Sequence, residues 1–170
     1  MRPHAVSRLV AALVTACGAI ALLGASPPPQ HTAARYFLGT WNCGGVKWTW
    51  SALDPGSGWV RIVYGDPKKP AGSAVVGYVD ALRTYVYRDF HADGSYADLV
   101  TAGPVGGRWT FNGPYYPSAA SAPLYGRIIY IVVNPRRYDR TFAMLKGRKL
   151  VPMGGDRCIK VSPKGRRVEK

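Results

Sequence analysis

The chain has 170 residues, which is one domain's worth and enough to bury a hydrophobic core without metal ions or many disulfides. Apolar residues make up 47% and aromatic residues 12% of it, a globular composition that excludes a disordered chain. The formal net charge is +14 at pH 7, and the basic excess lies in residues 127–170, which hold 13 Lys or Arg and 3 Asp or Glu.

Residues 1–25 are typical of a secretory signal peptide. A basic start precedes an uncharged apolar run over residues 9–25, which ends in small residues. We expect cleavage near Ala25 and export to the periplasm or the cell exterior. Two alternatives stay open, an uncleaved membrane anchor and a lipoprotein acylated at Cys17, and both also place the domain outside the cytoplasm.

Residues 26–35 follow as a short Pro-rich linker with polyproline character. Beyond the linker, no segment keeps a 3.6-residue apolar period, and short β-branched and aromatic runs are separated by turn residues. The folded domain spans residues 36–162, and a basic tail follows over residues 163–170. The predicted strands cover residues 36–43, 46–53, 59–64, 74–80, 84–91, 95–101, 108–111, 127–133, 141–146 and 158–161, with a further short candidate near 149–153.

Tight turns between sequential strands predict how the sheet is built. Asp93 and Gly94 lie between two alternating runs and predict a hairpin with a type I′ turn, which requires positive φ at both central residues. Trp48 and Trp50 share one face of their strand. About ten short strands in sequence favour an antiparallel sheet that closes on itself, because closure removes exposed edges. An open sandwich is the alternative.

The opening and closing strands carry a resemblance to a known group of proteins. The G-T-W-x-C stretch at residues 39–43 resembles the G-x-W opening of lipocalins and other calycin-type barrels. It is more similar to an uncharacterised bacterial family of exported, lipocalin-like domains, which close with a Cys-containing basic strand such as residues 156–160. Residues 75–103 and 107–113 resemble that family's central hairpins. The resemblance implies an all-β, antiparallel calycin-like barrel of about 8–10 strands, and the family has no settled activity.

The mature chain keeps two cysteines, Cys43 and Cys158. An exported chain with an even pair of cysteines predicts one disulfide, and these two residues allow a single intramolecular pairing. In a closed barrel the first and last strands are neighbours, so cysteines on them can come within bridging distance. Two free thiols are the alternative.

Residues that would support catalysis or bind a metal ion are few. His31 and His91 are the histidines that follow the signal sequence, and a Cys43–His91 pair is the remaining nucleophile–base alternative. The chain has no G-x-S-x-G motif and no set of three or four Cys and His ligands at zinc spacing. Asp89 and Asp98 flank one hairpin, and we expect them to pair with surface arginines. We therefore assign no catalytic residue and no metal site.

The opening stretch also resembles the G-x-W-x-G-x-G start of the haem-binding nitrobindin barrels. Cys43 replaces the first of the later glycines, and Gly45 matches the second. No histidine follows His91 that could serve as an axial ligand in the C-terminal strands. We therefore expect neither haem nor another cofactor.

Two sets of residues are candidates for binding. Aromatic side chains would line an interior pocket for a small apolar molecule or lipid, unless they simply fill the core. These are Trp41, Trp48, Trp50, Tyr78, Tyr85, Tyr87, Trp109 and Phe111. Basic side chains would dock on an anionic surface, unless they are merely solvated. These are Arg136, Arg137, Arg140, Lys146, Arg148 and Lys149.

The sequence thus predicts an exported, non-catalytic β-barrel that binds a small hydrophobic ligand in its interior. The alternative function is a structural or adhesion module that associates with an anionic cell-envelope surface. Export argues against nucleic acid as a partner. The sequence predicts no particular oligomeric state.

Overall fold

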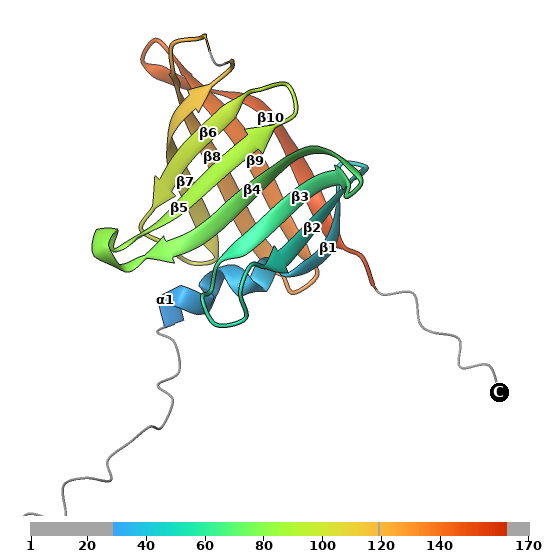
Figure 1. Cartoon of the computed structure of the whole chain (residues 1–170). Helices are drawn as coiled ribbons and strands as arrows, with labels where there is room; N and C mark the ends of the chain where they lie inside the picture. Colours follow the sequence, from blue (N-terminus) through green and yellow to red (C-terminus); the bar gives the residue numbers. More distant parts are fainter. Residues whose placement is uncertain (1–28, 119, 163–170) are drawn as a thin grey trace, which may run out of the picture.

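The fold is a closed β-barrel, seen in a computed structural model that describes residues 29–118 and 120–162. The predicted signal peptide and basic tail lie outside these residues. Each of the ten antiparallel strands lies beside the next one in the chain, and β1 lies beside β10 (Figure 1). The predicted all-β, antiparallel barrel is therefore confirmed. The strands are β1 (Gly39–Cys43), β2 (Val46–Ala52), β3 (Val60–Asp66), β4 (Lys69–Val79), β5 (Thr84–His91), β6 (Tyr96–Thr101), β7 (Arg108–Tyr116), β8 (Leu124–Asn134), β9 (Arg137–Lys146) and β10 (Lys149–Lys160).

The last strand and the linker differ from the prediction. β10 is continuous where the sequence predicts two short strands, because a β-bulge between Pro152 and Gly154 absorbs the interruption of the pattern. Before the barrel, the helical turn α1 (Pro29–Thr32) and a 3₁₀ turn (Ala33–Phe37) replace the polyproline segment expected up to residue 35. The first strand therefore begins at Gly39 rather than at residue 36.

The hairpin between β5 and β6 forms where predicted, with a different turn. The Gly94 N–H donates to the His91 carbonyl, and the His91 N–H donates to the Ser95 carbonyl. Gly94 has a φ of 82°, whereas Asp93 keeps a negative φ. A type I′ turn needs both residues at positive φ, so this connection is a three-residue loop that ends in a left-handed glycine.

A disulfide closes the seam between the first and last strands. β1 pairs with β10 in the register Trp41–Lys160, Asn42–Ile159 and Cys43–Cys158. Cys43 and Cys158 are bonded to each other and are both buried. The predicted disulfide is confirmed, and it lies where the pairing between neighbouring strands is short.

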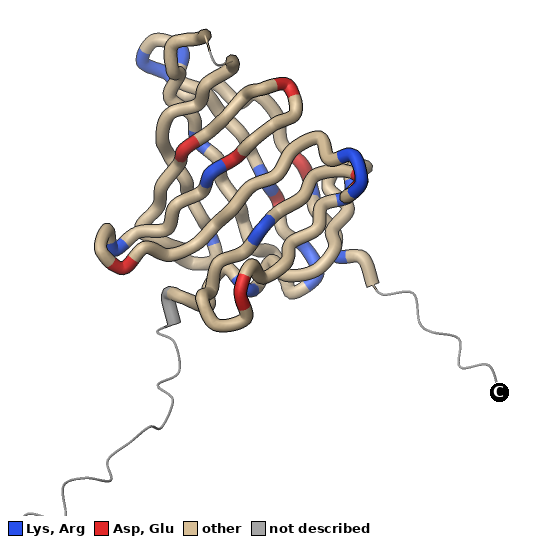
Figure 2. The backbone as a smooth tube through the Cα atoms, viewed as in Figure 1, with Lys and Arg blue, Asp and Glu red and all other residues tan. Residues whose placement is uncertain are grey.

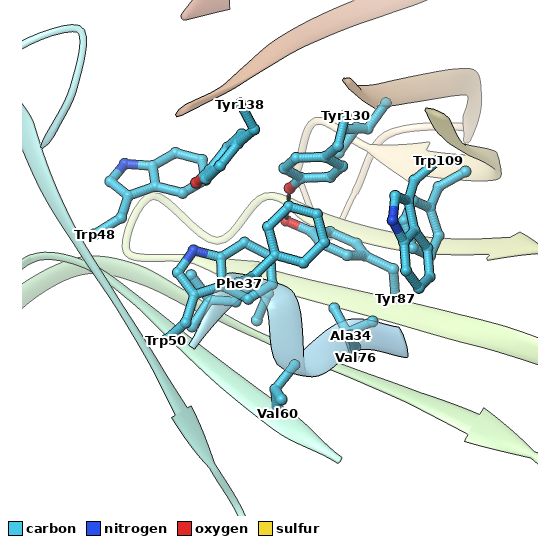
Figure 3. Packing of buried hydrophobic residues seen from close by; sticks show 14 of the residues in the cluster. Ala34, Phe37, Trp48, Trp50, Val60, Val76, Tyr87, Trp109, Tyr130 and Tyr138 are labelled. Atoms are coloured by element: carbon cyan, nitrogen blue, oxygen red, sulfur yellow. Dashed lines mark hydrogen bonds between the residues drawn. The ribbon is translucent and has the colours of Figure 1, made fainter. Parts of the chain in front are cut away.

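Phe37 closes one end of the barrel from inside. The α1 segment and the 3₁₀ turn lie across this end (Figure 1), and Phe37 enters the barrel from it (Figure 3). Its ring stacks on Trp50 at a centroid distance of 4.7 Å and meets Tyr130 and Tyr138 edge-on at 5.6 and 5.2 Å. The Trp41 Nε1–H donates to the Phe37 carbonyl over 2.6 Å, which fixes the plug to β1. We call this end the closed end.

Candidate functional site at the open end of the barrel

The interior changes from aromatic to charged toward the end opposite α1, which we call the open end. β5 shows this change along a single strand, because every second residue points inward. From the closed end outward, these residues are Tyr85, Tyr87, Asp89 and His91. The first three are buried, whereas the His91 side chain is 36% exposed. A charged residue inside a barrel is unusual enough to mark a candidate site.

Three tyrosine hydroxyls meet between the two halves of the interior. The Tyr87 hydroxyl lies 2.6 Å from that of Tyr64 on β3 and accepts a hydrogen bond of 3.3 Å from that of Tyr130 on β8. Figure 3 shows the Tyr87 and Tyr130 hydroxyls pointing toward each other. Tyr87 in turn donates to Asp89 Oδ2 over 3.3 Å. We call these three side chains the hydroxyl floor, because aromatic packing lies on one side of them and charged residues lie on the other.

Asp89 is the best-buried charged residue of the open half, and one of its oxygens has no partner. Oδ2 lies 3.2 Å from His91 Nε2 and also receives the Tyr87 hydrogen bond. Oδ1 is buried without a hydrogen-bond partner within residues 29–118 and 120–162, and the whole side chain is 7% exposed. A buried carboxylate oxygen normally finds a donor, because leaving it unpaired costs its lost hydration. The site therefore holds an unused acceptor.

Arg140 lies inside the barrel on β9, where Trp48, Asp156 and the Tyr130 hydroxyl hold it. Its guanidinium carbon lies 4.6 Å from the ring centroid of Trp48, a cation–π arrangement. Its Nη2 donates to Asp156 Oδ2 on β10 over 2.7 Å. Its Nε–H is buried and has no hydrogen-bond partner among the residues that the structure describes. A paired cation with one spare donor thus lies in the same half of the barrel as Asp89.

The surroundings shift the proton affinities of this cluster. Burial, reinforced by the charge of Asp89, raises the pKa values of Tyr64 and Tyr87 well above that of a free tyrosine. Burial also raises the pKa of Tyr130 to about 12. The hydrogen bond to Asp89 raises the pKa of His91. The floor therefore stays protonated and can donate, while His91 changes charge nearer to neutral pH.

Two half-buried aromatic side chains complete the open end. Tyr115 on β7 and Phe142 on β9 pack against the core with their ring centroids 5.5 Å apart. Both lie near the strand ends that lead into the open-end turns. The open end thus combines an apolar wall with a carboxylate, a guanidinium and a titratable imidazole.

The eight predicted aromatic candidates all belong to the packed interior. Seven are buried and Tyr78 is half-buried. Trp48 and Tyr87 contact the charged cluster, whereas Trp50 and Trp109 lie around Phe37. Ring contacts among them fill the closed half, which is the alternative use that the sequence left open.

The structure separates the six basic candidates. Arg136 and Arg137 lie at the closed end, where Arg137 pairs with Asp139 at 2.8 Å. Arg140 points inward, as described. The remaining basic candidates lie around the β9–β10 turn at the open end and are Lys146, Arg148 and Lys149. Lys and Arg are accordingly spread over both ends of the barrel (Figure 2) rather than gathered on one face.

A surface groove of about 700 Å³ runs beside β1 and the end of β10. Its polar lining includes Thr40 and Asn42 as well as two lysines, Lys47 and Lys160, and the lysines have no carboxylate partner among the residues that the structure describes. The Lys160 ammonium lies 5.1 Å from the ring centroid of Trp41. This groove is basic and lies beside the seam between β1 and β10.

Sequence reasoning missed part of the open-end cluster. Asp98 pairs with Arg88 at 3.5 Å on the outer face, as expected, but Asp89 is buried and pairs with His91 instead. The parity of β5 could have revealed this, because residues 85, 87 and 89 must share a face. The sequence around Tyr64 and Arg140 did not indicate that these two side chains join a charged cluster inside the barrel.

Comparison with known proteins adds no family or named relative. No protein-family model and no curated protein matches the chain. Within residues 29–118 and 120–162, no three or more His, Cys, Asp or Glu side chains are grouped so as to hold a metal ion. No helix in the same part of the chain is long and apolar enough to cross a membrane. The protein is thus defined by its fold and site: a disulfide-closed, ten-stranded barrel with a charged cluster at its open end.

Proposed function

We propose that this protein binds a small organic molecule at the open end of its barrel. The observation that carries the proposal is the Asp89 carboxylate, buried inside the barrel with one oxygen left without a donor. Arg140 supplies a spare donor in the same half. Buried polar groups that lack partners are costly, and ligand sites are places where proteins retain them.

The ligand that suits this end has an apolar or aromatic body and at least one polar group. Tyr115 and Phe142 offer an apolar wall for the body. Asp89 Oδ1 requires a donor from the ligand, and Arg140 Nε–H requires an acceptor. The proposal keeps the small-molecule binding that the sequence predicts and adds a polar anchor to it.

A fragment screen tests the proposal and does not require the ligand to be identified first. Fragments would be found by saturation-transfer NMR and then mapped by backbone amide shifts on the full chain. We expect bound fragments to shift the amides of His91, Tyr115 and Phe142, and to leave the closed-end amides of Arg136 and Arg137 unshifted. The proposal is wrong if no fragment shifts the open-end amides, or if all fragments bind elsewhere.

A second candidate function is association with an anionic envelope surface. The observation that favours it is the groove beside β1, where Lys47 and Lys160 have no acidic partner within the described part of the chain. Lys47 is exposed and Lys160 is half-buried. A lysine close to an anionic membrane contributes about 1 kcal/mol to binding. Cosedimentation with phosphatidylglycerol vesicles, compared with phosphatidylcholine vesicles, tests it; equal binding to both would count against this function.

A further inference from the structure

We propose that the ligand of the open end is an organic monocation with an ammonium group, which binds Asp89 in competition with the imidazole of His91. This inference rests on the proposed function and names the class of ligand. It also predicts that pH controls ligand binding, because His91 is the partner of Asp89 that the ligand must replace.

The charges of the cluster leave Asp89 as the unbalanced group. Arg140 and Asp156 neutralise each other through a 2.7 Å contact. The hydroxyls of the floor remain uncharged because burial raises their pKa values. Asp89 then has His91 as its sole ionisable partner among the described ion pairs. When His91 is neutral, the cluster carries one net negative charge, which a single ammonium group compensates.

The order of the side chains places His91 between Asp89 and solvent. His91 is the last residue of β5 before the turn, and its ring stacks on Tyr64 with centroids 5.8 Å apart. Its side chain is 36% exposed, against 7% for Asp89 beneath it. A ligand arriving from the open end therefore meets the imidazole first. An ammonium group has three donors, enough to occupy Oδ1 and to replace the imidazole bond on Oδ2.

Protonation of His91 should oppose this exchange. The groups that face His91 are Asp89 on its own strand, Asp93 in the turn, Tyr64 on β3 and Arg140 on β9. The hydrogen bond to Asp89 favours the imidazolium, so His91 becomes neutral only above the pKa of a free histidine. Below its raised folded-state pKa an imidazolium–carboxylate pair holds the site, and above that pKa a weaker neutral contact does. Cation affinity must therefore rise with pH.

Three probes that differ in one group test the charge. Tyramine carries an ammonium on a phenol with a short alkyl chain, tyrosol carries a hydroxyl in its place, and 4-hydroxyphenylpropionate carries a carboxylate. Binding to the full chain would be measured by isothermal titration calorimetry at about pH 5.5 and pH 8. We expect tyramine to bind at pH 8 at least about tenfold more tightly than tyrosol, since hydrogen bonds to charged groups have this magnitude. The carboxylate should bind least.

Variants test the assignment to residues. Asp89→Asn should weaken tyramine binding about tenfold or more, with circular dichroism confirming the fold. His91→Gln should bind tyramine with an affinity that no longer changes between the two pH values. His31→Gln is the matched control, because His31 pairs with Asp80 at 2.9 Å at the closed end. It should keep the pH dependence of the unmodified protein.

Each outcome separates the inference from the proposed function. If tyrosol or the carboxylate binds as tightly as tyramine, the cation is refuted while small-molecule binding stands. If tyramine fails to bind while the fragment screen finds open-end ligands, the same conclusion holds. A pH dependence that persists in His91→Gln refutes the control of ligand binding by His91. If no fragment binds at the open end, both proposals are wrong.

Discussion

Reduction of the Cys43–Cys158 disulfide should remove a large share of the stability of this barrel. The bond closes a loop with a sequence separation of 115 residues. In the chain-entropy model a loop of this length restricts the unfolded chain by about 4.8 kcal/mol at 25 °C. Native single domains have unfolding free energies of about 5–15 kcal/mol, so the bond accounts for much of the total. Apart from the disulfide, β1 and β10 are joined by three registered residue pairs and by flanking backbone hydrogen bonds such as Val161 N–H to the Thr40 carbonyl at 2.8 Å.

The assay compares urea unfolding of the oxidised and the reduced protein, followed by tryptophan fluorescence. The thiol state would be checked by alkylation and mass spectrometry in each sample. A Cys43→Ala, Cys158→Ala variant is the control, since its unfolding should not respond to the reductant. We expect the unfolding free energy to fall by about 4–5 kcal/mol on reduction. A fall below about 1 kcal/mol would refute the entropic argument and show that strand pairing alone holds the seam.

Three further predictions concern the plug, the imidazole and the groove. Phe37→Ala should lower the unfolding free energy by about 3–5 kcal/mol, because a buried ring is lost from the centre of the closed half. A decrease below about 1 kcal/mol in urea unfolding would contradict this packing role. His91 has a raised pKa in the folded state. Its contribution to stability is therefore present in full below the free-histidine pKa of about 6.5 and is lost as pH rises through the higher folded-state pKa. The unfolding free energy of the unmodified protein minus that of His91→Gln should thus decline from about pH 6 to pH 8, and a constant difference would oppose this. The double variant Lys47→Gln, Lys160→Gln should bind phosphatidylglycerol vesicles about tenfold or more weakly at low salt. The control double variant Lys146→Gln, Lys149→Gln should lose less affinity. Equal losses would mean that the net charge of the protein, and not the groove, determines binding.

The architecture was predictable because local sequence patterns determine where the strands and turns lie. Turn residues mark the ends of the strands, and alternation places Trp48 and Trp50 on one buried face. The closing disulfide follows from cysteine count. By contrast, the helical turn before the barrel depends on the packing of Phe37 against strands that are distant in sequence. Local propensity does not predict such packing.

The charged cluster was less predictable for a specific reason. Arg140 lies in the most basic part of the sequence, where arginine usually indicates a solvated surface. Its inward direction is set by the register of β9, in which Tyr138 and Arg140 share a face, and by its partner Asp156 on β10. Tyr130 lies in a strand that is apolar on both faces. The alternation of polar and apolar residues therefore could not show which way its side chain points. Such contacts are properties of the closed barrel and not of any one segment.

Both halves of the interior bury polar atoms without a partner among the described residues, but those of the closed half, Trp50 Nε1 and Tyr85 Oη, are neutral, whereas Asp89 in the open half is a carboxylate. The closed half stacks rings around Phe37, and the disulfide restricts the unfolded chain, so both stabilise the fold. The open half leaves one oxygen of Asp89 without a donor, an arrangement that lowers stability because the oxygen has lost its hydration. A packed core would replace this carboxylate with an apolar side chain at little cost. Its presence beside the half-buried His91 is therefore better explained by a ligand that completes its hydrogen bonds than by folding alone.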